Sequence, residues 1–302
     1  MTETILLTGA TGFIGSHLLE ALLKKDCKII ILKRSFSDTW RIKSLLPKVT
    51  SYDIDKTDIE DVFKHKIDKV VHLATYYHKF GGDTKLFAEA NIEFPMLLLD
   101  QMAKKGVKFF INTGTFVEYE TGGIISESTQ KKAYNLYAAS KMAFAEILKY
   151  YCSTGKVKAL DLKLFSPYGP KDNEKLFVYM IKSFIKKTIF EITKGEQRWN
   201  WTYVKDIVSA YLKALDAIEG IDQSYSELCI GTNKVYSIRE VVTILENISG
   251  IKSLASFSRK YPENEIFYAN CDNSRARSLL GWEPKYDLIK GLRETYSYYG
   301  GG

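Results

Sequence analysis

Tyr137 and Lys141 are the residues whose types and spacing most directly suggest chemistry. Residues four positions apart share a helix face, so a helix over 135–151 would place the phenol beside the ammonium. A free tyrosine has a pKa near ~10, but a neighbouring Lys⁺ favours the phenolate and lowers that pKa. Such a pair can donate a proton to a carbonyl under reduction, or accept one from an alcohol under oxidation.

Thr113 and Thr115 are candidates for a hydroxyl that polarises the same oxygen. They follow an expected strand at 107–112, and ligands of open α/β sheets bind beyond the carboxyl ends of the strands. Thr113 is the first choice, and Thr115 is the reserve. Both could instead be turn threonines that cap the end of the strand.

A glycine-rich segment near the start predicts the cofactor class. Gly9-Ala10-Thr11-Gly12-Phe13-Ile14-Gly15 follows an apolar strand at 5–7 and opens a helix expected at 13–25. Glycines there permit a tight turn and close approach of the backbone to a pyrophosphate, whose charge the helix N-terminus stabilises. We therefore expect a dinucleotide to contact Gly9, Thr11, Gly12, Phe13 and Ile14.

The end of the second strand bears on the choice between NAD and NADP. An acidic residue there would bind the ribose 2′-hydroxyl and repel a 2′-phosphate, but this chain has Lys33, Arg34 and Ser35. An arginine can bind a phosphate in bidentate fashion. We therefore expect NADP(H) to be preferred, with NAD(H) possible. In the alternative interpretation, Lys33 and Arg34 simply face water.

The order of the expected elements predicts an α/β fold. Strands are expected at 5–7, 28–32, 49–54, 69–73, 107–112 and 158–165, and helices at 13–25, 40–46, 57–65, 84–105 and 135–151. Strict alternation predicts a Rossmann doubly wound parallel sheet. We expect residues 1–165 to form the dinucleotide-binding domain. Residues 166–302, with helices near 174–186, 205–217, 237–248 and 275–280, should form mainly a smaller substrate-binding lobe, with some elements returning to the main sheet.

Composition narrows the class of protein further. Cys27, Cys152, Cys229 and Cys271 form no C-x-x-C pair and have no histidine at ligand spacing, which predicts free thiols in a reducing cytoplasm and no metal. No apolar run approaches the length of a membrane span, and no basic n-region of a signal peptide precedes the first strand. The net charge of +7 is scattered over lysine doublets, so we expect neither a nucleic-acid nor a membrane partner.

With these features in place, the sequence resembles the extended short-chain dehydrogenases/reductases of the NAD-dependent epimerase/dehydratase family along nearly its whole length. The family implies a nucleotide-sugar substrate and a homodimer through the helices near 84–105 and 135–151. Besides the glycine loop and Tyr137 with Lys141, the resemblance rests on Asp53-Ile54, Val71-His72-Leu73-Ala74-Thr75, Asn91, Phe165-Ser166-Pro167-Tyr168-Gly169-Pro170, Tyr203-Val204-Lys205-Asp206-Ile207-Val208, Ile230-Gly231-Thr232 and Leu280-Gly281-Trp282-Glu283-Pro284.

The resemblance also implies roles for single residues. Lys141 would bind the nicotinamide ribose as well as lower the tyrosine pKa. The adenine would contact Asp53 and Ile54, the dinucleotide path would be lined by Leu73, Ala74 and Thr75, and the nicotinamide would lie beside Ser166 and Pro167. Substrate contacts are expected at Tyr76, Thr115, Ser166 and Arg198.

Two departures from the family pattern affect the grip on the substrate diphosphate. The usual Arg-Asp-Phe is replaced by Gln197-Arg198-Trp199-Asn200-Trp201, so Arg198 is displaced by one position or has lost its role. A second arginine is expected where this chain has Pro262, and Arg259 or Lys260 could substitute. The tryptophans could stack on a base or a sugar, although core packing is the favoured interpretation.

Three reactions share this scaffold: 4-keto reduction, 4-epimerisation and 4,6-dehydration. Similar dehydratases have an Asp-Glu pair after the catalytic threonine, whereas here Gly114-Thr115 follows Thr113. The cations at 33–34 favour a reductase that exchanges NADP(H) over an NAD-dependent 4-epimerase. The segments 72–78 and 112–116 look most like those of CDP-abequose synthase-type reductases. We therefore expect NADPH-dependent reduction of the C4 ketone of a nucleotide-linked 4-keto-6-deoxy (or 3,6-dideoxy) hexose. A non-catalytic NADP sensor or RNA-binding scaffold is a further alternative.

Overall fold

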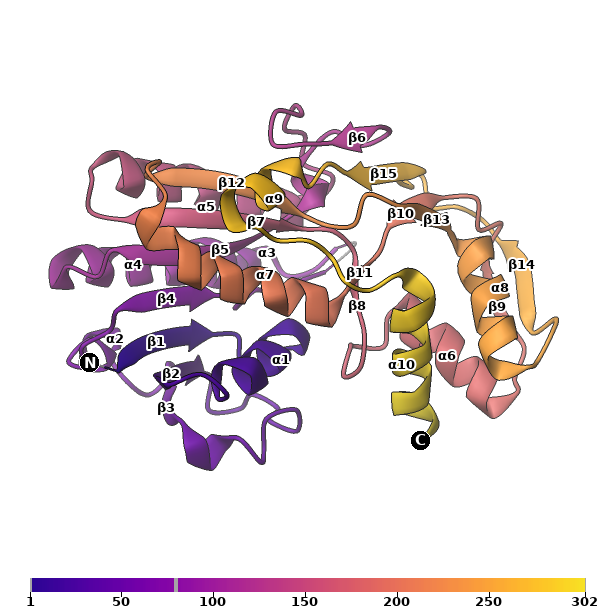
Figure 1. Cartoon of the computed structure of the whole chain (residues 1–302), viewed down its shortest axis with the longest axis horizontal. Helices are drawn as coiled ribbons and strands as arrows, with labels where there is room; N and C mark the ends of the chain where they lie inside the picture. The colour runs from indigo at the N-terminus through magenta and orange to yellow at the C-terminus, as the bar shows by residue number, and fades with distance from the viewer. Residues whose placement is uncertain (1, 79–80, 302) are drawn as a thin grey trace.

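The computed structural model describes residues 2–78 and 81–301. At its centre is a sheet of seven parallel strands in the order β12-β7-β5-β4-β1-β2-β3 (Figure 1). The prediction of a doubly wound parallel Rossmann sheet is therefore confirmed. The strands are β1 (Glu3–Thr8), β2 (Cys27–Lys33), β3 (Thr50–Asp53), β4 (Lys69–His72), β5 (Phe109–Thr115), β7 (Lys158–Leu164) and β12 (Tyr225–Ile230).

Helices cover both faces because successive side chains of a strand point to opposite sides of the sheet. Leu7 of β1 belongs to a core shared with α1 (Phe13–Leu22), α7 (Val204–Ala217) and α9 (Ser274–Leu280). Its neighbour Leu6 belongs to the opposite core, shared with α2 (Ile59–Val62), α4 (Phe94–Lys105) and α5 (Leu136–Ser153). None of the helices in the described residues is long and apolar enough to cross a membrane.

Several predicted boundaries need correction. No α-helix forms at 40–46, where the chain makes turns followed by a 3-10 turn (Leu46–Lys48). The expected helix 84–105 is divided into α3 (Thr84–Ala88), a π-helical turn (Glu89–Glu93) and α4. Strand β5 continues to Thr115, so both candidate threonines lie in a strand rather than in a turn. The last helix, α10 (Leu288–Gly300), was not predicted.

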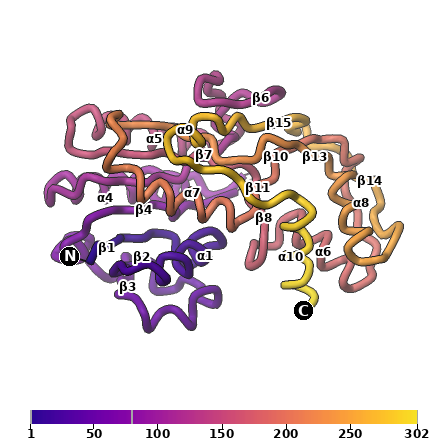
Figure 2. Tube along the Cα trace, viewed as in Figure 1, coloured from indigo at the N-terminus to yellow at the C-terminus, as the bar shows by residue number. Residues whose placement is uncertain are grey.

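A second group of elements lies at the right and upper right of Figure 1. It contains α6 (Leu176–Lys186), α8 (Ile238–Ser249), α10 and a four-stranded sheet of β13 (Val235–Ser237), β10 (Arg198–Asn200), β15 (Tyr268–Cys271) and β6 (Ile124–Ile125). Two small parallel pairs complete it: β8 (Pro167–Tyr168) with β11 (Thr202–Tyr203), and β9 (Phe190–Thr193) with β14 (Ala255–Arg259). The chain first contributes β6 to this group, between β5 and α5, and enters it again after β7. It returns to the main sheet with α7 and β12, goes back to the group with β13, and crosses once more before and after α9 (Figure 2).

Gly291 of α10 allows this helix to pack directly on β8. A Cβ at Gly291 would lie 2.1 Å from the hydroxyl oxygen of Tyr168, whose side chain is buried. Gly291→Ala should therefore destabilise the protein by about 1–3 kcal/mol through overpacking, although alanine favours a helix by about 1 kcal/mol over glycine. Urea unfolding measures this change.

The matched control is Gly300→Ala, at the end of the same helix, where the nearest atom to a new Cβ is 3.9 Å away. This variant should be neutral or slightly more stable than the wild type. Equal stability of the two variants would contradict the close packing of α10 on Tyr168.

Candidate active site

The glycine loop lies at the point where the strand order reverses, between β1 and β4, which is where open α/β sheets bind their ligands. Gly9 has a φ of 72°, and a Cβ there would be 2.6 Å from the backbone of Leu73 and Ala74. A Cβ at Gly15 would be 2.1 Å from the Gly9 carbonyl oxygen. The loop therefore has room only for backbone, as a pyrophosphate cradle requires.

Thr8 fixes the loop that follows β4. Its buried hydroxyl is 2.8 Å from Nδ1 of His72 and accepts hydrogen bonds from the backbone N–H groups of Leu73 (3.2 Å) and Ala74 (3.1 Å). The predicted dinucleotide path at Leu73, Ala74 and Thr75 is thus held at the ends of β1 and β4.

Asn91, in the π-helical turn, joins this path to the helix that carries the catalytic pair. Its side-chain oxygen accepts hydrogen bonds from the Thr75 hydroxyl (3.0 Å) and the Tyr76 N–H (2.8 Å). Its Nδ2 donates to the Tyr76 carbonyl (3.0 Å) and to the Ser140 hydroxyl of α5 (2.9 Å). One buried amide therefore sets the position of the loop relative to α5.

Tyr137 and Lys141 lie in the first turns of α5, which begins where the Asn135 side chain accepts a hydrogen bond from the Ala138 N–H (2.9 Å). Both side chains are buried, and Tyr77 packs edge-on against Tyr137 with ring centroids 4.9 Å apart. Burial raises the pKa of Tyr137, and a hydrogen bond with Thr75 opposes that rise. The net direction is opposite to the lowering by Lys141 that the sequence predicted, because desolvation of the phenol is the larger effect. The phenol is therefore held as a proton donor at neutral pH.

The side chain of Lys141 is buried, with 2% of the surface of the residue exposed. Burial lowers its pKa to about 8, while the carboxylates of Glu118 and Asp161 oppose the fall and Lys163 adds to it. Within residues 2–78 and 81–301 no hydrogen bond or ion pair of its ammonium is found. Its donors therefore remain available to a ligand such as a ribose.

The two candidate threonines differ in what their hydroxyls contact. Thr113 donates to the His72 carbonyl oxygen (2.7 Å) and is 2.6 Å from the hydroxyl of Tyr211 in α7, whose side chain is buried. The single proton of Thr113 is thus already committed inside the protein, which argues against the first choice. Thr115 ends β5, immediately before the 3-10 turn Phe116–Glu118. The Thr115 side chain accepts a hydrogen bond from the Glu118 N–H in a capping box, which does not use its own proton, so the geometry favours Thr115.

The edge of β2 is only partly as expected. Lys33 lies next to Asp53 in the parallel register of β2 and β3, and the two form an ion pair. The charge of Lys33 is therefore balanced by the residue predicted to contact adenine, which argues against a role of Lys33 at a 2′-phosphate. No ion pair of Arg34 is found in the described residues, and its guanidinium lies 5.0 Å from the Phe36 ring centroid.

Ser35 is also occupied at this edge. Its N–H and hydroxyl donate to Asp55 at 2.6 Å and 2.5 Å, and these hydrogen bonds lower the pKa of that carboxyl. Of the three residues at the end of β2, Arg34 is thus the one whose charged side chain remains available to an anion.

A cavity of about 400 Å³ lies at the start of α5, lined by His78, Gly81, Gly82, Thr84, Tyr134, Asn135, Leu136 and Asn264. Two predicted substrate residues face other partners: Tyr76 packs on Phe87 with ring centroids 4.8 Å apart, and Arg198 pairs with Glu240 at 3.4 Å. Sequence reasoning named Tyr76, but the structure places its neighbour Tyr77 against Tyr137. No local pattern distinguishes these adjacent tyrosines.

Other predicted residues have mainly structural surroundings. Ser166 has a φ of 28°, and its carbonyl accepts from the Thr202 N–H (3.3 Å) at the β8–β11 pair that contains Pro167. The Trp201 indole donates to the Tyr236 carbonyl (3.3 Å) and is buried in the core of the second group. This agrees with the favoured interpretation of core packing for Trp201.

The sequence did not single out a group of buried charges beside the pair. Lys163 and Asp161 of β7, with Glu118 after β5 and Glu227 of β12, form ion pairs beneath α5. A lysine and an aspartate two positions apart in an apolar strand, as in 158–164, were the only available signal.

The comparisons with known proteins agree with this geometry. Residues 5–264 match the NAD dependent epimerase/dehydratase family. CDP-abequose synthase from Salmonella muenchen is 30% identical over 300 residues, and 98% of each chain is covered. UDP-glucose 4-epimerase from Erwinia amylovora is 25% identical, with 98% of this chain and 97% of that one covered. UDP-glucuronic acid 4-epimerase from Bacillus cereus, solved with UDP-glucuronic acid and NAD, has a TM-score of 0.88 and 28% identity, with 98% of each chain covered.

A dinucleotide cradle with a buried tyrosine–lysine pair defines a nicotinamide-dependent oxidoreductase. The chain belongs to the NAD-dependent epimerase/dehydratase family and is an NAD(P)-dependent enzyme.

Burial of Lys141 predicts how stability depends on pH. The pKa of this lysine is about 8 in the folded protein and 10.5 without burial, so the folded chain loses the proton first as the pH rises. The cost of burying the cation is present in full below pH 8 and is relieved between pH 8 and 10.5. Lys141→Met should therefore be more stable than the wild type at pH 7, by on the order of 3 kcal/mol, and this advantage should vanish near pH 10.5.

Urea unfolding at several pH values checks this prediction. Lys104→Met is the control, because Lys104 is exposed and pairs with Asp100 one helical turn away. It should show a small difference from the wild type that changes little with pH. A Lys141→Met advantage that stays constant up to pH 10.5 would contradict a desolvated ammonium.

Proposed function

We propose that the protein reduces the C4 ketone of a nucleotide-linked 4-keto-6-deoxy (or 3,6-dideoxy) hexose with NADPH. The observation that carries the proposal is a buried Tyr137 and a buried Lys141 one turn apart on α5, with no hydrogen bond or ion pair of the Lys141 ammonium among the described residues, in a fold that also holds a glycine cradle after β1. A family relative named CDP-abequose synthase, with which the chain aligns over almost its full length, supports this class of substrate.

The chemistry that bound NADPH supplies is a hydride for C4. Tyr137 donates its proton to the forming alkoxide, and its raised pKa keeps that proton in place until the oxygen gains charge. Lys141 stabilises the phenolate left behind and binds the nicotinamide ribose. Thr115, the reserve candidate, holds the substrate oxygen, because the hydroxyl of Thr113 is committed to His72 and Tyr211.

The preference for NADP(H) now rests on Arg34. Lys33 is paired with Asp53 and Ser35 with Asp55, which leaves one cation at the edge of β2 for a 2′-phosphate. Arg34 lies beside Phe36, so its guanidinium is exposed yet partly oriented, as bidentate phosphate binding needs.

Dehydration has no support from the residues near the threonines. Gly114 and Thr115 follow Thr113, and Phe116 and Val117 follow Thr115, so neither threonine is followed directly by the acidic pair of similar dehydratases; Glu118, three positions after Thr115, is buried in an ion pair with Lys163. A non-catalytic sensor or RNA-binding scaffold would have no use for a buried proton donor and a buried cation. The NAD-dependent 4-epimerase remains the second candidate, because the similar structure from Bacillus cereus is a 4-epimerase with NAD.

The remaining expectations stay proposals of the same kind. A homodimer through α4 and α5 is consistent with the exposed side chains of Met96, Leu97, Leu136 and Tyr150 on these helices. We also propose that the protein is located in the cytoplasm and that residues 166–302 form most of its substrate-binding lobe.

The direct assay follows NADPH oxidation with CDP-, dTDP-, UDP- and GDP-linked 4-keto-6-deoxy sugars, with NADH in parallel. At least one sugar should turn over, and Tyr137→Phe should lower its kcat by a factor of about 10³ or more because the proton donor is removed. NADPH binding, measured by fluorescence titration, should change little. Wild-type turnover by Tyr137→Phe would refute the role of the tyrosine.

Arg34→Ala tests the cofactor assignment. The KM for NADPH should rise about 10-fold or more through loss of a charge-assisted phosphate contact, while the KM for NADH should stay within about twofold. Lys33→Met is the comparison variant and should have the smaller effect, since its charge is already balanced by Asp53. A wild-type KM for NADH equal to or below that for NADPH would rule out the preference.

A further inference from the structure

Five charged groups form a cluster between the sheet and α5, and the reaction proposed above uses none of them. Lys163 is fully buried, and its ammonium lies 2.5 Å from Glu118 Oε2, 2.7 Å from Asp161 Oδ2 and 3.8 Å from Glu227 Oε1. Lys131 closes the outer side, 2.8 Å from Glu227 and 3.8 Å from Glu118. We call these residues the charge cluster: Glu118, Lys131, Asp161, Lys163 and Glu227.

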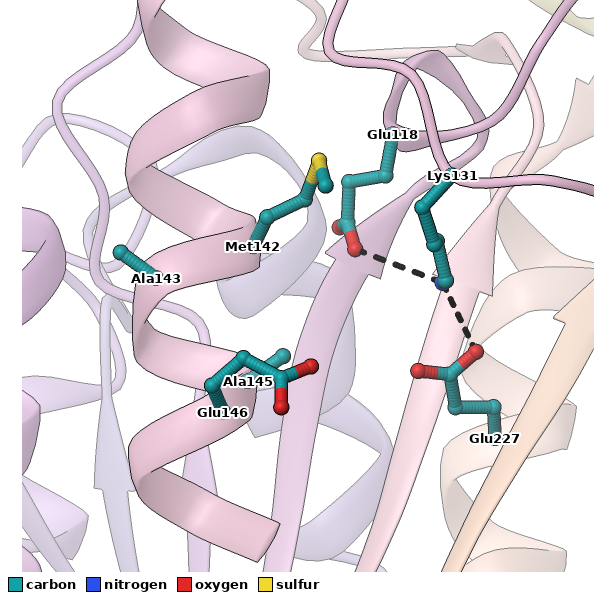
Figure 3. Close-up of a pocket in the computed structure, with 7 residues that line it drawn as sticks. All are labelled: Glu118, Lys131, Met142, Ala143, Ala145, Glu146 and Glu227. Atoms are coloured by element: carbon teal, nitrogen blue, oxygen red, sulfur yellow. Dashed lines mark hydrogen bonds and ion pairs between the residues drawn. The ribbon is translucent and has the colours of Figure 1, made fainter.

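The outer rim of the charge cluster opens into a cavity of about 150 Å³ beside α5. Figure 3 shows Lys131 between the carboxylates of Glu118 and Glu227, with Met142 and Glu146 of α5 on the other side. Solvent can therefore approach Lys131 and Glu227, whereas Glu118, Asp161 and Lys163 are closed off from it. The inner three residues are the ones nearest to the catalytic elements.

The first link to the site runs through the end of β5. Glu118 Oε1 accepts a hydrogen bond from the backbone N–H of Thr115 at 2.9 Å, while its other oxygen contacts Lys163. Lys163 also passes across Gly114, where a Cβ would lie 2.5 Å from Lys163 Cδ and 2.8 Å from its Nζ. Glu118 and Lys163 thus fix the backbone on both sides of the peptide that leads into Thr115.

The second link is electrostatic. Three carboxylates and two ammonium groups leave the charge cluster with one negative charge, and Lys141 brings the sum to zero. Lys141 interacts with Glu118 and Asp161, which favour its ammonium form, and with Lys163, which opposes it. From β4, the neutral buried His72 also faces Lys141. Asn112 of β5, the strand between β4 and β7, donates a hydrogen bond to the Asp161 carboxylate at 3.0 Å.

We propose that Glu118 and Lys163 are positioning residues of the active site: they fix Thr115 at the end of β5 and set the charge that faces Lys141. The proposal rests on the proposed function for its kinetic part alone. Burying charges is costly, and an apolar filling of the same space would stabilise the fold at least as well. A cluster that touches both Thr115 and the surroundings of Lys141 has its explanation in the site.

Two substitutions of Glu118 separate the two links. Glu118→Gln keeps a carbonyl oxygen for the Thr115 N–H but removes the negative charge, whereas Glu118→Met removes both. Glu146→Gln is the matched control, because Glu146 lines the same cavity from α5 and pairs with Lys149 at 2.7 Å.

Hydrogen exchange of the peptide containing residues 113–117 tests positioning without any substrate. Glu118→Met should exchange about 10-fold faster than the wild type at this peptide, and Glu118→Gln and Glu146→Gln should stay within about twofold. Unchanged exchange in Glu118→Met would overturn the positioning role. This holds whether or not any sugar is turned over, so it is decided independently of the proposed function.

The pH profile of kcat/KM, measured with a sugar nucleotide that the proposed assay shows to be turned over, tests the electrostatic part of the proposal. Glu118→Gln removes a negative charge that favours the Lys141 ammonium, so its alkaline limb should move to lower pH by about one unit. Glu146→Gln should keep the wild-type profile. Glu118→Asp retains a carboxylate at this position, so its alkaline limb should lie close to the pH of the wild-type limb. A Glu118→Gln profile that superimposes on the wild type, at reduced or unchanged kcat, would overturn the electrostatic part.

Discussion

The site depends on the close approach of two strand ends, those of β1 and β4. Gly9 presses against the backbone of Leu73 and Ala74, and the Thr8 hydroxyl joins both of these to His72. A side chain at Gly9 would separate the two loops, and with them the cradle for the pyrophosphate. Hydrogen bonds extend from this contact: the Thr75 hydroxyl donates to the Asn91 side chain, which in turn donates to the Ser140 hydroxyl, one residue before Lys141.

The burial of charged side chains is a second constraint on the site. Lys141 and Lys163 are both inside the protein on the α5 side of the sheet, yet their surroundings differ. Lys163 has carboxylate partners within hydrogen-bond distance, which raise its pKa, whereas Lys141 has no such partner among the described residues and burial lowers its pKa to about 8. The protein thus keeps one lysine as a fixed charge and the other as a donor available to a ligand and sensitive to its electrostatic environment.

Much of this arrangement could be predicted from the sequence. Apolar strands alternating with amphipathic helices specify the sheet, and the glycine loop and Tyr137 with Lys141 are local patterns that remain visible without a structure. The choice between Thr113 and Thr115 was not visible, since residues two apart in a strand point to the same face. The preference for Thr115 rests on the contact of Thr113 with Tyr211, almost 100 residues away in the chain.

The other corrections have the same origin. Lys33 meets Asp53 because β2 and β3 are paired in one particular register, which no local pattern specifies. The charge cluster draws on β7, β12 and the segments that follow β5, so its members are scattered from 118 to 227. Contacts between distant segments can be identified only in the folded chain, whereas turns, helix caps and helix faces can be predicted from a few neighbouring residues.

The central claim is net reduction at C4 by a protein-held proton donor and a nicotinamide hydride. Its most direct test is to incubate the enzyme with a 4-keto sugar nucleotide and with NADPH that carries deuterium as the transferable hydrogen on C4 of the nicotinamide ring. The product is then analysed by NMR and mass spectrometry. The account predicts one deuterium at C4 of the sugar and one NADP⁺ released per product. Unchanged 4-keto sugar and NADPH, together with deuterium-free inversion at C4 of a 4-hydroxyl sugar nucleotide in a parallel incubation and no net consumption of cofactor, would contradict it and identify a 4-epimerase.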